Sequence, residues 1–125
     1  MKLCLAIGGI AGLVLAGAVR AQASGDAARG EGLFEERCAS CHVAQGGGQG
    51  PSLVGVVGRR SATVPGLIYS KALQNAHVTW TPSELDRFLT NPAAAIPGTA
   101  MPLAVPNAKD RADLIAYLGS GANKP

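Results

Sequence analysis

Five consecutive residues, Cys38-Ala39-Ser40-Cys41-His42, constrain this chain more than any other stretch. A C-x-x-C-H run is the attachment pattern of c-type haem, in which two thiols add to the vinyl groups of the porphyrin and the histidine binds the iron. The spacing suits this chemistry because one helical turn presents both sulfur atoms to the same edge of the macrocycle. The motif therefore predicts a covalently bound haem.

Other uses of a C-x-x-C pair fit the chain less well. A thioredoxin-like dithiol would need a βαβ setting, which this Gly- and Ala-rich sequence does not predict. A structural zinc ion would need more ligands, because beyond the N-terminal segment the cysteines and histidines are only Cys38, Cys41, His42 and His77. A disulfide is the remaining alternative in an exported chain, and haem thioethers would remove both cysteines from that chemistry.

The N-terminus has the features of a secretory signal. A short positive start precedes an apolar run over residues 3–19 and the small-x-small pattern Ala21-Gln22-Ala23. We expect residues 1–23 to be a signal peptide cleaved after Ala23, which would leave residues 24–125 as a single periplasmic domain. The alternative is an uncleaved membrane anchor, because the apolar run reaches the lower limit of roughly 17–25 residues for a spanning helix.

The charge of the chain argues against nucleic acid as a partner. The full sequence has 11 Lys and Arg, eight Asp and Glu and a net charge of +3. Removal of Lys2 and Arg20 with the signal peptide would leave nine basic and eight acidic residues, a net charge of +1. The chain has no basic run, and aromatic residues make up only 4% of it.

Periodicity and capping residues predict an all-α fold of three main helices and one shorter helix. The first spans residues 25–37, where Gly30 suggests the close approach of another backbone. The apolar stretch over residues 52–58 is repeatedly interrupted by glycine, so we expect it to be irregular chain wrapped around another group rather than a strand. The short helix is expected over residues 69–75. Thr81-Pro82-Ser83-Glu84 predicts the start of a helix with a capping box, which ends at Asn91-Pro92.

A long extended loop is predicted from Ala93 to Pro106, and Asn107 then caps a final helix that ends at Gly119. This is too little regular structure to enclose a core, so we expect long Gly/Pro loops and helices wrapped around a cofactor. The loop contains Met101, the only methionine besides Met1. Its Pro-flanked position favours an iron ligand over simple packing, whereas His77, in a polar stretch, is expected at the surface.

Together these residues resemble class I cytochrome c, of the mitochondrial and bacterial c2-like kind, over essentially the whole mature chain. The positions that carry the resemblance are Gly30, Phe34, the Cys38–His42 motif, Gly50-Pro51, Gly58-Arg59, Pro65-Gly66, Tyr69, Trp80, Asn91-Pro92, the run 96–99 before Met101, and residues 113–118. The resemblance implies the cytochrome c fold, in which Gly30 and Phe34 meet Tyr117 and Leu118 where the first and last helices cross.

The resemblance also implies a set of haem contacts. One haem c would be held through Cys38 and Cys41, with His42 and Met101 as axial ligands, and the carbonyl of Pro51 would accept the other ring N–H of His42. Arg59, Tyr69 and the indole N–H of Trp80 would hold a buried propionate, although plain core packing is also compatible with Trp80.

Some residues depart from the mitochondrial pattern. Alanines occupy positions 93, 94 and 100, where the mitochondrial proteins carry lysines around the exposed haem edge. Phe88 stands where those proteins usually have a tyrosine whose hydroxyl approaches the methionine sulfur. Leu73 replaces a polar asparagine. The docking face should therefore be largely apolar and weakly charged, without strong electrostatic steering.

The function expected from these features is one-electron transfer between redox proteins outside the cytoplasm, without enzymatic activity, by a monomer that forms transient complexes. Two alternatives stay open. One is a haem-based sensor or small-ligand binder in which Met101 detaches from the iron. The other is a dedicated cytochrome subunit of a larger redox enzyme. Membrane association is expected only if the N-terminal signal is retained.

Overall fold

The computed structural model describes residues 24–121, so the predicted signal peptide, its cleavage site after Ala23 and residues 122–125 lie outside the described part. Residues 24–121 form five helices: α1 (Ala27–Arg37), α2 (Lys71–Ala76), α3 (Pro82–Thr90), α4 (Pro92–Ala95) and α5 (Ala108–Gly119). The only β-type pairing in this range is an isolated antiparallel bridge between Arg60 and Thr79. The all-α prediction is confirmed.

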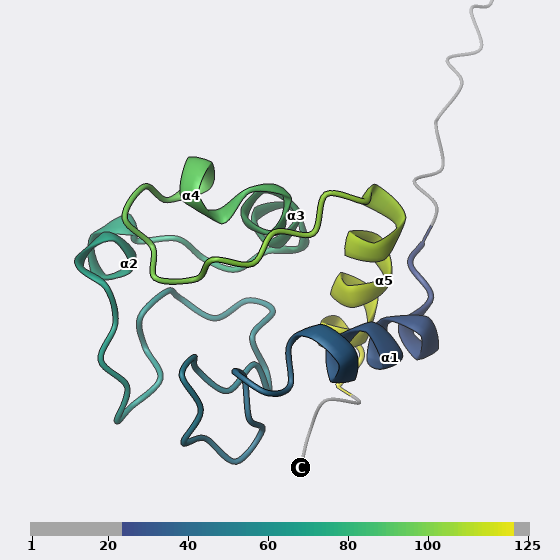
Figure 1. Cartoon of the computed structure of the whole chain (residues 1–125), viewed down its shortest axis with the longest axis horizontal. Helices are drawn as coiled ribbons and strands as arrows, with labels where there is room; N and C mark the ends of the chain where they lie inside the picture. Colours follow the sequence, from purple (N-terminus) through teal and green to yellow (C-terminus); the bar gives the residue numbers. More distant parts are fainter. Residues whose placement is uncertain (1–23, 122–125) are drawn as a thin grey trace, which may run out of the picture.

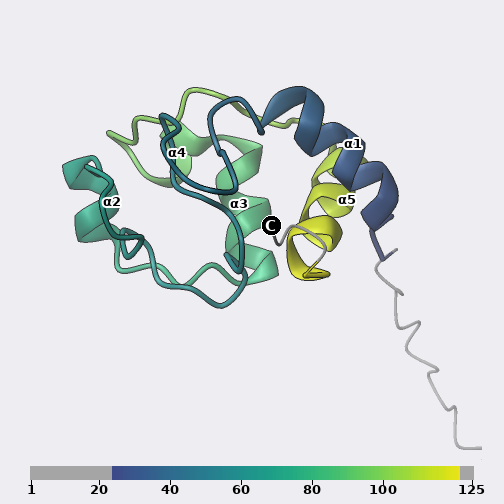
Figure 2. The same ribbon diagram turned by 90° about the horizontal axis from the view of Figure 1, so that it is seen from below.

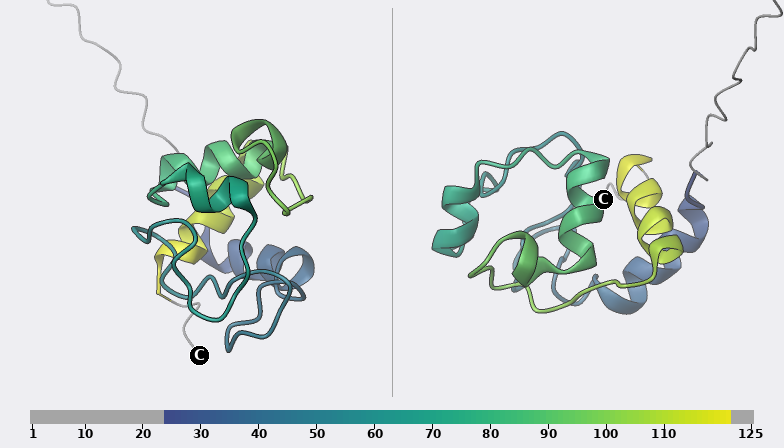
Figure 3. Two further views of the ribbon diagram at one scale, coloured as in Figure 1. Left: turned by 90° about the vertical axis from the view of Figure 1, so that its left-hand side faces the viewer. Right: turned by 90° about the horizontal axis from the view of Figure 1, so that it is seen from above.

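The helices are spread around the molecule and joined by long irregular connections. Figure 1 shows α1 and α5 crossing at one end, α2 at the other end, and α3 between them. Figure 2 and the right-hand view of Figure 3 show the same order. None of the described helices combines the length and apolar character needed to cross a membrane.

The crossing of α1 and α5 depends on a glycine. A Cβ atom at Gly30 would overlap the carbonyl oxygen of Asp113 in α5. Close approach of the two backbones brings the rings of Phe34 and Tyr117 together, with centroids 5.5 Å apart, and Leu118 is also buried. The expected meeting of the first and last helices is therefore confirmed.

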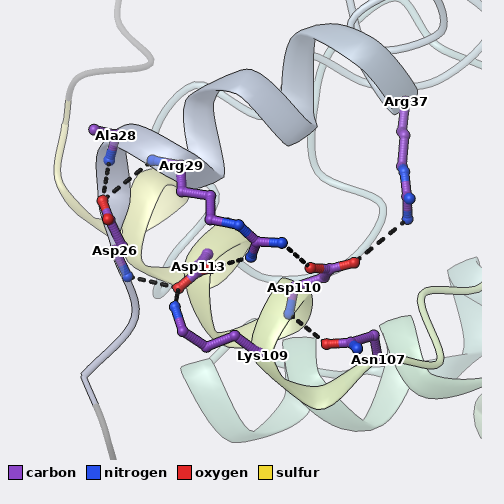
Figure 4. Close-up of polar contacts among 8 residues, drawn as sticks. All are labelled: Asp26, Ala28, Arg29, Arg37, Asn107, Lys109, Asp110 and Asp113. Atoms are coloured by element: carbon purple, nitrogen blue, oxygen red, sulfur yellow. Dashed lines mark hydrogen bonds and ion pairs between the residues drawn. The ribbon is translucent and has the colours of Figure 1, made fainter.

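A buried ionic cluster fastens the start of α1 to α5 (Figure 4). The carboxylate of Asp113 is fully buried and accepts hydrogen bonds from the side chains of Lys109 and Arg29 and, at 2.6 Å, from the backbone N–H of Asp26. Arg29 also binds Asp110 at 2.6 Å. The bonds from Lys109, from the Asp26 N–H and from Arg29 lower the pKa of Asp113 from 3.8 to about 2.

Two predicted helix caps are present, and one predicted detail is wrong. The Thr81 hydroxyl accepts the N–H of Glu84 at 3.2 Å at the start of α3, and the Asn107 side chain accepts the N–H of Asp110 at 3.0 Å at the start of α5. Glu84 does not complete a capping box, because its carboxylate binds the guanidinium of Arg87 at 2.8 and 3.0 Å instead.

The predicted extended loop over residues 93–106 is wrong at its beginning. Asn91 accepts the N–H of Ala94 at 3.1 Å and caps the short helix α4, with Pro92 at its first position. A proline that ends one helix is well suited to begin the next, because its missing N–H is not needed there. Helix α2 begins at Lys71 rather than residue 69, because Ser70 is its N-cap.

Candidate haem site

The irregular connections and the helices enclose a cavity of about 460 Å³ with a mostly apolar lining. All eight site residues predicted from the sequence line this one cavity: Cys38, Cys41, His42, Pro51, Arg59, Tyr69, Trp80 and Met101. His77 is not among the lining residues. It is exposed and ends α2 in a left-handed conformation with φ of +51°.

The attachment motif begins where α1 ends. The N–H of Cys38 still bonds to the carbonyl of Phe34 at 2.8 Å, and the N–H groups of Cys41 and His42 then turn back to the carbonyl of Cys38 at 3.1 and 2.9 Å. These tight turns carry both sulfurs and the imidazole to the cavity wall. The two thiols are not joined by a disulfide, and burial raises the pKa of the Cys38 thiol. Both sulfurs are thus available for thioether formation.

A backbone carbonyl fixes the orientation of the His42 ring. Nδ1 lies 2.7 Å from the carbonyl oxygen of Pro51, and because a carbonyl can only accept, Nδ1 carries the proton and Nε2 has the free lone pair. Gly50 permits this approach, since a Cβ there would lie 2.6 Å from Cε1 of the ring. Its own N–H donates to the carbonyl of Cys41 at 2.9 Å. The imidazole is therefore prepared to bind a metal through Nε2.

Met101 reaches the same cavity from the connection between α4 and α5. The residue is half-buried and packs against the hydrophobic core. Its N–H lies 3.4 Å from the hydroxyl oxygen of Thr99. Phe88, which also lines the cavity, is buried against Trp80 with ring centroids 5.1 Å apart, and it offers no hydroxyl to the Met101 sulfur. The cavity thus brings together a thioether and an imidazole from distant parts of the chain.

One part of the cavity wall has a cation without an anionic partner and an indole N–H without an acceptor within residues 24–121. Arg59 donates to the carbonyls of Val54 at 3.0 Å and Ser52 at 2.8 Å, but within residues 24–121 it forms no ion pair, and burial lowers its pKa. Trp80 is 8% exposed, and its indole N–H has no acceptor in the described part of the chain. No acidic side chain is among the cavity-lining residues.

Tyr69 adds a further donor to this wall. Its hydroxyl oxygen accepts the N–H of Val64 at 3.1 Å, which leaves the hydroxyl proton free to donate. A cation and hydrogen-bond donors that are partly or fully removed from water are costly unless an anion or acceptor pairs with them. The wall therefore fits a carboxylate-bearing group, and the cavity as a whole fits haem c: apolar walls, two thiols, metal donors and a site for an anion.

The sequence placed Phe88 beside Met101, and both residues line the cavity, but it did not identify other apolar lining residues such as Leu53 and Val56. Leu53 and Val56 lie in a stretch interrupted by glycines, which the sequence predicted only to wrap something. Apolar residues without a helical or alternating period were the available signal. A metal site built from acidic, cysteine and histidine side chains is a poor alternative, since residues 24–121 contain no group of three or more such side chains placed to hold an ion.

Known proteins match the chain in both sequence and structure. The family model described as Cytochrome c matches residues 27–122. A cytochrome c of Euglena viridis is 50% identical over 97 residues, covering 75% of this chain and 95% of that protein. The cytochrome c-type cyt cy of Rhodobacter capsulatus is 46% identical over 99 residues, covering 78% of this chain and 50% of that protein. The solved structure of cytochrome cH from Methylobacterium extorquens superposes with a TM-score of 0.73 at 38% identity, covering 77% and 99% of the two chains.

Proposed function

Because the chain belongs to the cytochrome c family, we propose that it is a monohaem electron carrier that works between redox proteins outside the cytoplasm. The observation that carries this proposal is the convergence of two thiols, the oriented imidazole of His42 and the thioether of Met101 on one cavity. A bound haem c would supply the chemistry, the exchange of one electron between ferric and ferrous iron.

Different residues of the cavity would hold different parts of the haem. Cys38 and Cys41 would form the thioethers, and His42 Nε2 and the Met101 sulfur would bind the iron. The Pro51 carbonyl fixes the ring of His42 and increases its basicity through the bond to Nδ1. If both protein groups bind the iron, no open site would be left for a substrate, and little rearrangement would accompany electron transfer.

The wall that contains Arg59, Tyr69 and Trp80 accepts a haem propionate. The guanidinium already has two of its N–H groups fixed by backbone carbonyls, so little further ordering is needed to bind a carboxylate. Within residues 24–121, neither the indole N–H of Trp80 nor the hydroxyl proton of Tyr69 has an acceptor. Binding one carboxylate would therefore pair the half-buried guanidinium of Arg59 and satisfy the remaining donors.

Export is part of the same proposal. Residues 1–23 have the pattern of a signal peptide, and cleavage after Ala23 would leave a domain, residues 24–125, that begins just before α1. The intact mass of the protein recovered from the periplasm tests this point. It should equal residues 24–125 plus one haem. A mass that includes residues 1–23 would instead support a retained anchor.

The docking surface should be recognised by shape more than by charge. Alanines 93, 94 and 100 are exposed, and Ile68, which lines the cavity, has 98% of its surface exposed. Transient binding of redox proteins should therefore respond weakly to salt. Size-exclusion chromatography with cell extract at low and high salt separates a free carrier from a permanent subunit of a larger enzyme.

Spectroscopy of the purified protein tests the ligand assignment. The reduced protein should show the narrow bands of c-type haem, and the oxidised protein should show a sulfur-to-iron charge-transfer band. Met101→Ala should remove that band and shift the reduction potential. His77→Ala is the matched control and should change neither, because His77 lies outside the cavity lining. A potential that Met101→Ala leaves untouched would refute the assignment.

One observation favours a second function. Phe88 cannot stabilise the Met101 sulfur with a hydroxyl, so the methionine is held with one fewer hydrogen bond and could detach to admit a small ligand. Rapid carbon monoxide binding by the reduced protein at neutral pH would support such a sensor. A stable charge-transfer band would exclude it as the resting state.

A further inference from the structure

Met101 lies in a segment that is anchored on both sides. Ile96 is 5% exposed on its N-terminal side, and Val105 is fully buried on its C-terminal side. The N–H of Val105 donates to the carbonyl of Leu89 near the end of α3 at 2.7 Å. In Figure 1 this segment runs from α4 past α3 to the start of α5. The position of Met101 therefore depends on how firmly these two anchors are held.

The side chain of Arg111 binds the second anchor, at Val105, through the backbone carbonyls of Val105 and Pro106. Nη1 of Arg111 donates to the carbonyl of Val105 at 3.0 Å and to that of Pro106 at 2.8 Å. Nε donates to the carboxylate of Asp86 in α3 at 2.7 Å. The Arg111 side chain is 11% exposed, whereas that of Asp86 is 51% exposed. One buried guanidinium thus joins α5, α3 and the segment that contains Met101.

The guanidinium is well suited to this position for two reasons. Its planar fork can bind two carbonyls and a carboxylate at once, so the buried cation is paired and the buried carbonyl of Val105 is satisfied. Pro102, which follows Met101, restricts the backbone of both residues. Because only three residues separate Met101 from Val105 and the first of them is this proline, a displacement at Val105 would be transmitted to the thioether.

We propose that Arg111, oriented by Asp86, is a positioning residue for Met101, and that the strength of this anchor sets how often the thioether leaves the iron. The inference rests on the proposed function, because Met101 is an iron ligand only there. Arg111 is not one of the cavity-lining residues, so it would act on the ligand through the backbone of residues 102–106.

Arg29 provides a matched control. It is also an arginine bound to α5, but its partners are Asp110 and Asp113, in the cluster that fastens α1 to α5. It has no hydrogen bond to the segment 96–107. Its loss should lower the stability of the whole molecule without releasing Met101. A ligand-specific effect can therefore be separated from general destabilisation.

The test uses the haem-loaded protein and compares Arg111→Met, Asp86→Ala and Arg29→Met. Two readouts report the methionine: the rate of carbon monoxide binding to the reduced protein and the charge-transfer band of the oxidised protein. Because bonds from a charged donor to the anchor are lost, Arg111→Met should speed carbon monoxide binding about ten-fold or more. Asp86→Ala should act in the same direction to a smaller extent, since Arg111 keeps its carbonyl partners.

Circular dichroism at the same temperature shows which variants remain folded, and Arg29→Met should lower the melting temperature while it leaves both readouts unchanged. The inference is wrong if folded Arg111→Met and Asp86→Ala bind carbon monoxide at the unmodified rate, or if Arg29→Met accelerates binding equally. If Arg111→Met does not fold, Asp86→Ala decides. If the unmodified protein lacks the charge-transfer band, Met101 is not an iron ligand, and the proposed function is wrong as well. If the unmodified protein has the band but the variants bind carbon monoxide at its rate, only this inference is wrong.

Discussion

Gly50 shows how one missing side chain determines the orientation of the candidate iron ligand. A Cβ at this position would lie 2.6 Å from Cε1 and 2.8 Å from Nδ1 of His42. These atoms belong to the side of the ring that faces the Pro51 carbonyl. Any larger residue must therefore displace either the ring or the loop that presents its hydrogen-bond acceptor.

Substitution Gly50→Ala should consequently weaken the His42 to Pro51 bond. We expect the free energy of unfolding to fall by about 1–3 kcal/mol, the usual cost of overpacking. The reduction potential should also change, because the bond at Nδ1 tunes the basicity of the ligand. Denaturant unfolding and potentiometry measure the two effects. Gln45→Ala, at an exposed position of the same loop, is the control, and equal effects in both variants would contradict this account.

Asp113 makes a pH-dependent contribution to stability. Hydrogen bonds from Lys109, from the Asp26 N–H and from Arg29 lower its pKa to about 2 in the folded protein. A lowered pKa means that the stabilisation is complete above the ordinary value of 3.8 and is lost as the pH falls through about 2. The unfolding free energy should therefore decrease between about pH 4 and pH 2.

Asp113→Asn removes this dependence and serves as the test. The variant should be less stable than the unmodified protein at pH 6, and the difference should shrink as the pH approaches about 2. Chemical denaturation at several pH values gives the comparison. Glu36→Gln is the control, because Glu36 is exposed and has no partner within residues 24–121. A difference that stays constant with pH would refute the role of Asp113.

At the scale of elements, two glycines of α1 have opposite surroundings, so substituting each distinguishes the effect of helix propensity from that of helix packing. A Cβ at Gly30 would overlap the backbone of Asp113, whereas a Cβ at Gly32 would have no atom within 4 Å. Gly32→Ala should therefore raise the free energy of unfolding by about 0.5–1 kcal/mol, because alanine is the better helix former. Gly30→Ala should lower it, because α1 and α5 must separate. Thermal unfolding of both variants checks this, and equal signs would contradict it.

The element boundaries that could be predicted from the sequence rest on local signals. Thr81 and Asn107 cap their helices through hydrogen bonds to residues three positions later, which a sequence displays directly. Asn91-Pro92 carries the same kind of signal twice, because the proline both ends α3 and begins α4, and a sequence does not show which of the two it does. The capping box predicted for Glu84 does not form because Arg87, three residues further on, binds the same carboxylate.

The residues of the candidate site could be predicted from the sequence where the chemistry requires a fixed number of residues between them. Covalent attachment places Cys38, Cys41 and His42 within one short motif. By contrast, the bond from Arg29 to Asp113 joins residues 84 positions apart, and Arg111 binds Asp86 across 25 positions. Neither pairing leaves a local pattern, because each exists only once the helices have packed. These contacts required the folded structure.

At the scale of the whole molecule, the acidic side chains are separated from the cavity. The eight acidic residues lie at or within α1, α3 and α5, and the sequence between Arg37 and Ser83 contains none. The cavity lining instead includes Arg37, Arg59 and Arg60. Acidic side chains therefore stabilise the fold through clusters such as that of Asp113, while the cavity retains the basic groups that a haem carboxylate would meet.

The cavity also determines how the fold depends on its cofactor. A cavity of about 460 Å³ is far larger than the voids that a packed domain leaves between its side chains. Its walls are mostly apolar, so without haem they lose packing contacts and face water, which opposes folding. Without haem, the direct packing of α1 on α5 is the main helix contact that remains, and it does not involve α2 or the long connections. We therefore expect the haem-free chain to lose its fixed tertiary structure.

A variant with Cys38→Ser and Cys41→Ser, which cannot form thioethers, tests this dependence. Purified without haem, it should lack the near-ultraviolet circular dichroism of packed Trp80 and show no cooperative thermal transition. Adding haem to the same variant should restore both signals in part, since the volume is then filled and the ligands are intact. Recovery would show that filling the cavity, rather than the covalent link, determines the fold. A cooperative transition in the haem-free variant would instead mean that the loops can collapse onto the cavity at a much smaller cost than its volume implies.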